Sequence, residues 1–325
     1  MVNGGRRFRR ISDLPRHYNA VEILERNLAR HPDKQALLSA GREMSFAEVA
    51  AEVNRVGRAL RRLGVRGGET VGLLCPDSAE WVATFFGAVK IGAVAVSFNT
   101  FLRSGELAYV LGDSRVRVLV AHRSLLEAIE PIRDALPSLE HVVVIGGGGR
   151  AGDEDFADWV SAEVAELEPA QTHRDDICTL NYSSGTTGEP KGIPHAHKDL
   201  PITAQLVGVD TLGLNASDRT FAAAKLFFTF GTGGNLIFPW YVGGSIVLFA
   251  GSPRVPADIL ATMERFQPTV HFNAPTGYAA MLASPDFALE RLESLRLCVS
   301  AGEALPAAIW HAWKTKTGHE IVDGL

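Results

Sequence analysis

Short apolar runs alternate with amphipathic stretches along most of the chain. The runs TVGLLC, AVAVSF, RVRVLVA and HVVVIG are rich in β-branched residues and are bounded by turn residues, as is typical of buried strands. Between them, residues 77–93 and 103–114 place apolar side chains at helical spacing. Strands that alternate with helices of this length predict crossover connections and an α/β fold with a mostly parallel, doubly wound sheet.

Two further helices are predicted before the first of these strands. Apolar positions from about Ala20 lie on one helical face until Pro32 ends the pattern. Ser45 and Glu48 then form a capping box at the start of an amphipathic stretch that Gly64 terminates. Helical structure is therefore expected close to the N-terminus.

The alternation pauses at residues 146–172, where a glycine-rich run, GGGGRAG, precedes an acidic stretch that is predicted to be helical. It resumes with the apolar runs ICTLNY, SIVLFA, TVHFNA and LRLCVSAG, and with helices after Asp199 and from Pro256. The chain is therefore expected to form two α/β subdomains. The expected divisions are an N-terminal arm (1–17), a first α/β subdomain (18–172) and a second α/β subdomain (173–325).

Composition and charge narrow the classes of function. Hydrophobic residues make up 46% of the 325 residues and charged residues 21%, which is typical of globular domains and excludes collagen-like, disordered and disulfide-scaffold proteins. The net charge is -5, from 37 acidic and 32 basic residues, so a protein that mainly neutralises nucleic-acid phosphates is not expected. The basic cluster between Arg6 and Arg10 is predicted to be a solvated arm.

Cysteines and apolar runs bear on localisation. Cys75, Cys178 and Cys298 each lie in or beside an apolar, strand-like run, and an odd, unpaired set suits a reducing compartment. The N-terminus lacks the apolar core of a signal peptide, and the longest apolar stretch, 236–250, contains Pro239 and is shorter than a membrane span. A cytoplasmic protein without a membrane span is therefore expected.

Two glycine-rich loops are candidates for binding phosphate. In the first, Gly147, Gly149 and Gly152 match G-x-G-x-x-G after a strand and before a helix, as a dinucleotide-binding turn requires. The acidic residues 153–155, however, occupy the helix N-terminus, where a pyrophosphate needs a positive dipole. A glycine connector is therefore the favoured interpretation of this loop.

The loop that follows ICTLNY has a stronger chemical pattern. In SSGTTGEPKG, from Ser183 to Gly192, glycines let the backbone curl around an anion, hydroxyls add donors and Lys191 supplies a positive charge. Pro190 and Gly192 depart from the Walker sequence, and a plain Ser/Gly linker is disfavoured because a buried strand leads into the loop. The loop is therefore predicted to bind polyphosphate.

An H-x-H pair, His195 and His197, follows this loop. Both side chains would face one side of a strand, but no Cys or carboxylate at suitable spacing joins them, so no residue is assigned as a metal ligand. A structural role, or a hydrogen bond on the phosphate side, is the favoured interpretation of the pair.

The segment YSSGTTGEPKG resembles the signature of the adenylate-forming superfamily, the AMP-dependent ligases that include acyl-CoA synthetases. Agreement extends in order from about Tyr18 to Leu325, through FFGAVKIGAVAVSFN, AAKLFFTFGTGGNLIFPWYVGGSIVLF, TVHFNAPTGYAAML and LRLCVSAGEALP. The aromatic and SAGEALP segments are most similar to those of benzoate-CoA ligases and related aryl or cyclic acid ligases. The resemblance implies two doubly wound, mostly parallel sheet subdomains of the family's large N-terminal domain, incomplete at the C-terminus.

The resemblance also implies an activity and its reactants. Enzymes of this family use ATP and Mg²⁺ to convert a carboxylic acid to an acyl-adenylate, and they then pass the acyl group to a thiol, usually that of coenzyme A. An aromatic or cyclic small-molecule acid and coenzyme A are the expected partners, without nucleic acid, and a homodimer is left open. Two alternatives also stay open: an adenylation module that loads a carrier-protein thiol, and a non-catalytic fragment that binds nucleotide or acid.

Site residues follow from the same resemblance. In the phosphate loop, Thr186, Thr187 and Lys191 are the expected catalytic contacts. Phe228 is the first choice for the acid pocket, although each phenylalanine is as readily ordinary core, and Glu303 is alternatively a surface charge. The implied nucleotide-binding set is Ser183, Ser184, Gly185, Thr186, Thr187, Gly188, Lys191, Gly302, Glu303, Ala304, Asp323 and Gly324, and the implied acid-binding set is Phe227, Phe228, Phe230, Gly231, Asn273, Pro275 and Ala301.

The sequence departs from the family pattern at its last residues, IVDGL. In relatives, a segment with a magnesium-binding glutamate follows this point, and after it comes a small C-terminal domain with the catalytic lysine of adenylation. The resemblance implies that this chain lacks both the metal ligand and the C-terminal domain.

We predict that these 325 residues alone show almost no ATP–pyrophosphate exchange. The reason is that losing one electrostatic partner of a transition state commonly costs about 10²–10³ in rate. A pyrophosphate-exchange assay with a range of carboxylic acids measures this. Exchange as fast as that of a full-length relative would contradict the prediction.

Overall fold

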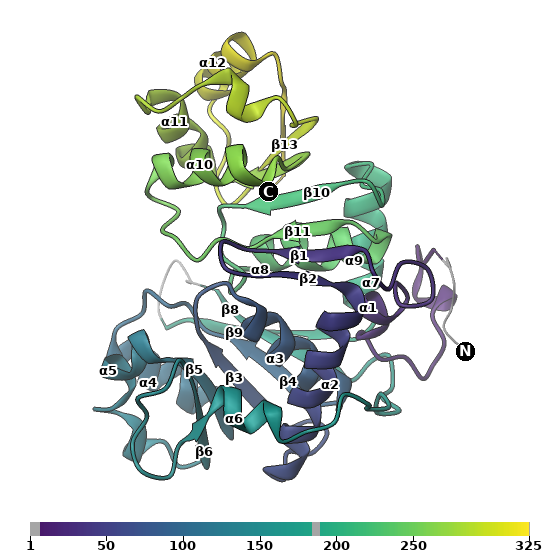
Figure 1. Ribbon diagram of the computed structural model, residues 1–325, viewed down its shortest axis with the longest axis vertical. Coiled ribbons are helices and arrows are strands. Elements are labelled where there is room, and N and C mark those ends of the chain that lie inside the picture. Colours follow the sequence, from purple (N-terminus) through teal and green to yellow (C-terminus); the bar gives the residue numbers. More distant parts are fainter. Residues whose placement is uncertain (1–6, 184–188, 325) are drawn as a thin grey trace. The chain divides into compact units, whose positions relative to one another are not determined.

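The computed structural model describes residues 7–183 and 189–324, which divide into two compact α/β units. The first unit contains the described residues up to Pro32 together with Phe46–Ile202, and the second contains Asp33–Ser45 together with the described residues from Thr203 onward. Within the described residues, each unit has one sheet of seven strands. The predicted α/β class with two mostly parallel sheets is confirmed (Figure 1).

The sheet of the first unit has the strand order β7-β6-β5-β3-β4-β8-β9. Neighbouring strands are parallel except β8 and β9, which form an antiparallel hairpin. Its central strands are nearly continuous runs of buried apolar residues, as expected of a parallel sheet that is covered on both faces. The strands are β3 (Thr70–Leu74), β4 (Val94–Ser97), β5 (Val118–His122), β6 (His141–Ile145), β7 (Glu154–Asp155), β8 (Ile177–Ser183) and β9 (Lys191–Ala196).

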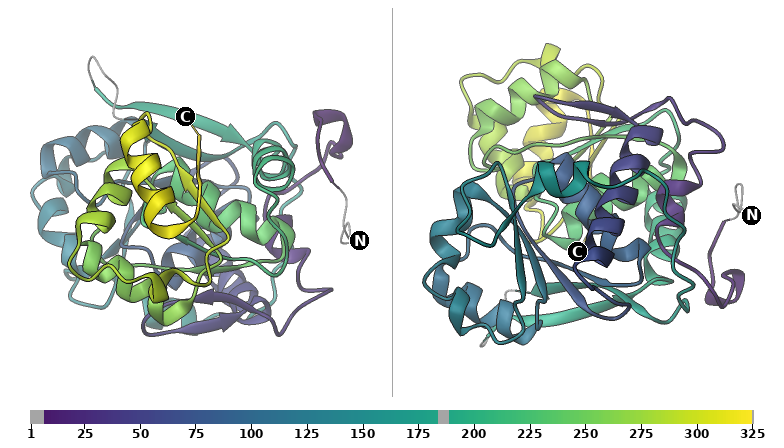
Figure 2. Two further views of the ribbon diagram at one scale, coloured as in Figure 1. Left: turned by 90° about the horizontal axis from the view of Figure 1, so that it is seen from above. Right: turned by 60° about the horizontal axis from the view of Figure 1, so that its bottom comes forward.

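Helices pack against this sheet, as Figure 2 shows. Leu107 and Val110 of α4 and Ile129 of α5 join the buried cluster formed by the central strands. Helix α3 contacts β3 and β4, and α2 packs along α3. The helices are α1 (Glu22–Glu25), α2 (Phe46–Arg62), α3 (Ala79–Lys90), α4 (Ser104–Asp113), α5 (Leu126–Ile129) and α6 (Phe156–Ser161), with 3₁₀ turns η1 (Ile11–Asp13), η2 (Arg123–Leu125) and η3 (Arg133–Ala135).

The sheet of the second unit has the order β14-β13-β12-β10-β11-β1-β2. All neighbouring strands are parallel except the hairpin of β1 and β2. The strands are β1 (Gln35–Leu38), β2 (Glu43–Ser45), β10 (Arg219–Ala222), β11 (Ser245–Val247), β12 (Val270–Asn273), β13 (Leu297–Ser300) and β14 (Ile321–Asp323).

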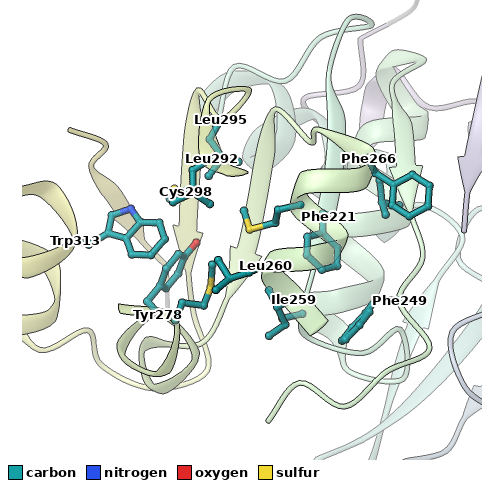
Figure 3. Close-up of a cluster of buried hydrophobic side chains, with 14 of the residues drawn as sticks. Phe221, Phe249, Ile259, Leu260, Phe266, Tyr278, Leu292, Leu295, Cys298 and Trp313 are labelled. Carbon is teal, nitrogen blue, oxygen red and sulfur yellow. The ribbon is translucent and has the colours of Figure 1, made fainter. Parts of the chain in front are cut away.

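Buried clusters lie on both faces of the second sheet. On one face, α10, α11 and α12 contribute Leu260, Tyr278 and Trp313, and the Trp313 ring lies edge-on to that of Tyr278 at 4.8 Å (Figure 3). On the other face, Phe272 packs with Phe230. The α-helices of this unit are α8 (Thr229–Thr232), α9 (Phe238–Val242), α10 (Pro256–Phe266), α11 (Pro275–Ala283) and α12 (Ala307–Thr317). It also has two π-helices, η4 (Ala204–Thr211) and η5 (Gly233–Ile237), and the 3₁₀ turn η6 (Leu289–Leu292). Helix α7 (Asp199–Thr203) contains the point in the sequence where the first unit ends and the second resumes.

Membrane-spanning structure is not found among the helices that the structure describes. None of them is long and apolar enough to cross a bilayer.

The division of the chain differs from the expected subdomains, 18–172 and 173–325. Residues 173–202 belong to the first unit, because β8 pairs with β4 in the register Ala95↔Thr179. Asp33–Ser45 belongs to the second unit, because β1 pairs with β11. Pairing between strands so distant in sequence leaves no signal in the local sequence pattern. A division of the chain into consecutive segments therefore cannot describe these two units.

Two predicted helices are shorter in the structure. The pattern from Ala20 forms only α1 followed by turns, where the Asn27 side chain donates to the carbonyls of Ile23 and Leu24 at 3.0 and 3.3 Å. Such a side-chain hydrogen bond offers the backbone an alternative to continuing the helix. The acidic stretch after Gly152 forms α6, which has 6 residues.

The N-terminal arm is packed along its described part. Phe8 is fully buried, and its ring lies 5.9 Å from the Tyr18 ring and 5.8 Å from the Arg26 guanidinium. Arg174 Nη1 donates to the Leu14 carbonyl at 2.7 Å. The described arginines of the basic cluster, Arg7, Arg9 and Arg10, are exposed as expected, but the segment is not a free arm, because the buried Phe8 and the contacts of Leu14 hold it within the first unit.

The contact between α2 and α3 predicts opposite effects for two glycines. A Cβ at Gly87 would lie 2.9 Å from Val56 Cγ1 and 3.1 Å from Gly57 N, whereas a Cβ at Gly112 in α4 would meet only Leu136, at 4.0 Å. Gly87→Ala should lower the free energy of unfolding by about 1 kcal/mol, because overpacking outweighs the gain in helix propensity. Gly112→Ala should raise the same quantity by about 0.5–1 kcal/mol.

Urea denaturation of the two variants and of the wild-type chain measures both effects. A Gly87→Ala variant that is stabilised as much as Gly112→Ala would show that the helix contact accepts a methyl group.

Candidate functional site

The predicted phosphate loop joins β8 to β9 at the edge of the first sheet. Ser183, the last residue of β8, pairs with Lys191, the first residue of β9. The hairpin therefore brings the two ends of the loop together. Five predicted contacts lie outside the described residues and stay predictions: Ser184, Gly185, Thr186, Thr187 and Gly188.

The other predicted site residues gather at one edge of the second sheet. Strands β10, β12, β13 and β14 are parallel, so their carboxyl ends meet at the same edge. Ala222 pairs with Phe272, Asn273 pairs with Ser300, and Ser300 pairs with Asp323. The loops that follow these strands carry the predicted acid-binding and adenine-binding residues, which are far apart in the sequence.

The three phenylalanines after β10 differ in exposure. Phe228 is 45% exposed, whereas Phe227 is buried and its ring lies 4.5 Å from that of Phe228. Phe230 is partly buried and packs edge-on against Phe272 at 5.8 Å. Of the three rings, that of Phe228 is the most accessible, as a wall of an acid pocket must be, and Phe227 supports it from behind.

Gly231, Asn273 and Pro275 have structural partners in this unit. A Cβ at Gly231 would lie 2.1 Å from the Lys225 carbonyl oxygen, so only glycine fits this close turn. The Asn273 side chain is buried, where its Oδ1 accepts from the next backbone N–H at 2.9 Å and its Nδ2 faces Met281 Sδ at 3.5 Å. Pro275 is the first residue of α11 and is buried. Direct contact of these residues with an acid stays a prediction.

The loop after β13 has an open backbone at its centre. Gly302 has φ +95°, a left-handed conformation that favours glycine, and no heavy atom lies within 4 Å of where its Cβ would be. Ala301 is buried and Ala304 is exposed. Glu303 accepts a 3.1 Å hydrogen bond from Thr276 N at the start of α11, where a negative charge interacts favourably with the helix dipole.

Asp323 and Gly324 lie at the same edge. Gly324 N donates to the Ser300 carbonyl at 2.7 Å, and Asp323 Oδ2 accepts from Leu305 N at 3.4 Å. Across the part of the chain that the structure describes, no three His, Cys, Asp or Glu side chains are grouped so that they could hold a metal ion. The described residues therefore offer no metal site made of three such side chains.

The glycine-rich run after β6 has the geometry of a connector. Gly147 and Gly152 have φ values of +72° and +95°, conformations that glycine adopts at little cost. The N-terminus of α6 is capped by the chain itself, because Asp155 Oδ1 accepts from Ala157 N at 2.9 Å. Asp153 pairs with Arg133. These carboxylates occupy the place that a pyrophosphate would need.

His197 has a structural role in the first unit. Its side chain is fully buried, and its Nδ1 accepts a 3.0 Å hydrogen bond from Ala20 N. Its Nε2 has no hydrogen-bond partner among the described residues. The neighbouring His195 lies on β9, where its carbonyl accepts a weak 3.5 Å hydrogen bond from Cys178 Sγ.

Sequence reasoning assigned no role to three buried polar residues of the aromatic segment. Lys225 Nζ donates to the Phe249 carbonyl, and Thr232 Oγ1 lies 3.2 Å from the Phe228 carbonyl oxygen. Asn235 Nδ2 donates to the Val247 carbonyl at 2.9 Å, and its Oδ1 accepts from Thr220 Oγ1 at 2.8 Å. Their signal in the sequence is a set of isolated polar residues within the apolar run KLFFTFGTGGNLIFPW.

Comparisons with known proteins agree with the resemblance read from the motifs. The family model described as AMP-binding enzyme matches residues 24–325. The chain is 40% identical over 315 residues to a benzoate–CoA ligase of Thauera aromatica, covering 96% of this chain and 59% of that protein. It is 62% identical to a solved anthranilate CoA ligase, AuaEII, in complex with anthranoyl-AMP, with a TM-score of 0.95 over 97% of this chain and 61% of the other.

A benzoate CoA ligase from Burkholderia xenovorans LB400 has a similar fold, with a TM-score of 0.86 and 32% identity over 94% of this chain and 60% of that one. The chain therefore spans less than two thirds of the length of each of these three relatives.

Burial of His197 predicts a pH-dependent stability. Burial lowers its pKa from 6.5 to about 4, and the Asp176 charge offsets part of this shift. Because the folded-state pKa lies below the ordinary value, the unfolded chain binds the proton more tightly, and stability that is present at pH 7 is lost as pH falls from 6.5 toward about 4. This residue should lower the free energy of unfolding by about 2 kcal/mol between pH 7 and pH 5.

The variant His197→Asn keeps a hydrogen-bond acceptor near Ala20 N and has no titrating side chain. Its free energy of unfolding, measured by urea denaturation at the two pH values, should depend on pH less than that of the wild-type chain. The buried His271 is present in both proteins, so its contribution cancels. An unchanged pH dependence would rule out His197 as its source.

Proposed function

Because the chain belongs to the AMP-binding enzyme family, we propose that it binds ATP and an aromatic carboxylic acid for an acid–thiol ligase reaction. The complete reaction would form an acyl-adenylate and then a coenzyme A thioester. One observation carries the proposal: the residues that the resemblance assigns to the acid and the adenine follow four strands distant in sequence and meet at one sheet edge.

Two displacements make up the proposed reaction. In the first, a carboxylate oxygen of the acid attacks the α-phosphorus of ATP, and pyrophosphate leaves. In the second, the sulfur of coenzyme A attacks the acyl carbon, the bond from that carbon to the phosphate oxygen breaks, and AMP leaves. The first step depends mostly on positioning and on neutralisation of phosphate charge.

Lys191 is the described cation that we assign to the pyrophosphate. It lies beside Ser183 at the base of the loop, and its residue is exposed. A mobile, exposed ammonium can follow a polyphosphate and supply a full positive charge. Magnesium, when bound, supplies further neutralisation of the phosphate charge.

The edge of the second sheet supports the assignment of adenine to the loop after β13. The left-handed backbone of Gly302 and the open space beside it would let a planar base approach the main chain. Glu303 is held at the start of α11, so the loop is braced on one side. A braced, glycine-centred loop suits recognition of a base edge by backbone groups.

An aromatic acid is the substrate class that we favour. The accessible ring of Phe228 is backed by Phe227, and an aromatic pair contributes about 0.5–1.5 kcal/mol beyond its buried area. The similar proteins are named as ligases of benzoate, 4-hydroxybenzoate and anthranilate. These acids share a carboxylate attached directly to a benzene ring, and we propose acids of this kind as the substrates.

A panel of acids tests the proposed substrate class on the full-length protein. We predict ATP-dependent pyrophosphate release with benzoate and anthranilate and little release with acetate. Phe228→Ala should raise KM for benzoate by about three- to tenfold, because one aromatic contact with the acid is lost. KM for ATP should be unchanged. Equal activity on acetate and benzoate would overturn the aromatic assignment.

Lys191→Ala tests the phosphate role. It should lower kcat by about 10²–10³, because a charge that stabilises the transition state is lost. Lys314→Ala is the matched control, since Lys314 pairs with Glu320 on the surface of the second unit. Equal turnover of the two variants would remove Lys191 from the reaction.

A further inference from the structure

Lys225 is a buried lysine at the start of the aromatic segment. It is 5% exposed, its Nζ donates to the Phe249 carbonyl, and the same Nζ lies 4.4 Å from the centroid of the Phe249 ring. An ammonium group is costly to bury unless hydrogen bonds or a π face compensate for lost hydration. The proposed reaction assigns no role to the positive charge of Lys225, so the burial of this charge requires another explanation.

Phe249, which accepts the hydrogen bond from Lys225, is itself fixed in the core. Phe249 follows β11, and its ring packs edge-on against Phe221 of β10 at 5.8 Å. Figure 3 shows both rings within the buried cluster of this unit. Lys225 therefore ties the chain that leaves β10 to the chain that leaves β11.

In the turn that begins at Lys225, both the N–H and the carbonyl group of Phe228 form backbone hydrogen bonds. Phe228 N donates to the Lys225 carbonyl at 3.0 Å, and the Phe228 carbonyl accepts from Thr232 N at 2.9 Å. Thr232 Oγ1 donates to the Leu226 carbonyl within the same turn and lies 3.2 Å from the Phe228 carbonyl oxygen. Phe228 thus has an anchored backbone and a side chain that is 45% exposed.

We propose that Lys225 is a positioning residue for the aromatic acid. It anchors the turn from residue 225 to residue 232, so that the Phe228 ring keeps one orientation at the carboxyl edge of the sheet. A ring that is already ordered loses little conformational freedom when a substrate stacks on it. This inference rests on the proposed function, because it assigns to Phe228 the acid that the enzyme activates.

Lys316 offers a matched control for the same pair of interactions. Its Nζ donates to the Leu282 carbonyl at 3.1 Å and lies 3.9 Å from the centroid of the Phe287 ring. Unlike Lys225, it is exposed, and it connects α12 to α11 without touching the aromatic segment. Replacing either lysine by methionine removes one charge and keeps an apolar stem of similar length.

Steady-state kinetics of the full-length variants separate a positioning role from a structural one. Lys225→Met should raise KM for benzoate by about three- to tenfold, the range of one aromatic contact, with KM for ATP unchanged. Lys316→Met should leave both constants unchanged. A parallel rise of both KM values in Lys225→Met would indicate general damage to the unit and overturn the proposal.

Amide hydrogen exchange without substrate gives a readout that does not depend on activity. In Lys225→Met, the N–H groups of Phe228 and Thr232 should exchange faster than in the wild-type protein, because the turn opens more often. In Lys316→Met they should exchange as in the wild type. Unchanged exchange in Lys225→Met would show that the lysine does not hold the turn.

The two readouts also separate failure of the inference from failure of the proposed function. If the wild-type protein activates no aryl acid, the proposed function fails, and exchange alone decides whether Lys225 anchors the turn. If the wild type is active and Lys225→Met matches Lys316→Met in both readouts, the positioning role is overturned.

A second variant keeps the test decisive if Lys225→Met does not fold. Thr232→Val removes the hydroxyl that donates to the Leu226 carbonyl and lies near the Phe228 carbonyl, and it keeps the shape of the side chain. It should give the same selective rise in KM for benzoate and the same faster exchange at Phe228. A Thr232→Val variant with wild-type KM values would contradict the idea that an anchored turn positions the ring.

Discussion

Parallel hydrogen bonding among β10, β12, β13 and β14 determines where the loops of the second unit gather. Their register places Asn273 beside Ser300 and Ser300 beside Asp323, so the loops that follow these strands start from one edge. Interior residues such as Phe272 are buried, and a slip by one residue would turn each side chain to the opposite face. The rigid sheet thus positions loops that are free to carry chemistry.

The sequence pattern was sufficient for the α/β class because buried parallel strands appear as apolar runs between amphipathic helices. It was insufficient for the division of the chain, because the pairing of β1 with β11 joins segments about 200 residues apart and depends on no local feature. The N-terminal arm shows the same limit. Phe8 is a single apolar residue among arginines, and its burial depends on contacts such as those with Tyr18 and Arg26, which follow it by 10 and 18 residues.

The candidate site could be assigned in part from motifs, since the phosphate loop and the SAGEALP segment are recognisable as strings of letters. The exposure of each side chain could not be predicted from motifs, because it depends on neighbours from other strands. Phe227 and Phe228 are adjacent and chemically identical, yet one is buried and the other is 45% exposed. Glu303 is exposed, as a surface charge is, but its 3.1 Å hydrogen bond from Thr276 N at the start of α11 could not be read from the sequence.

The exposure of Phe228 and the burial of Lys225 are related energetically. An accessible aromatic ring tends to collapse onto apolar neighbours, and burying the exposed part of a phenylalanine would contribute about 1 kcal/mol. A hydrogen bond from a charged donor contributes about 1.5–3 kcal/mol, which is enough to hold the backbone against that collapse. The ammonium of Lys225 is such a donor, and its acceptor belongs to a phenylalanine packed in the core. A buried charge that is bonded to the core can therefore keep an apolar surface available for an apolar substrate.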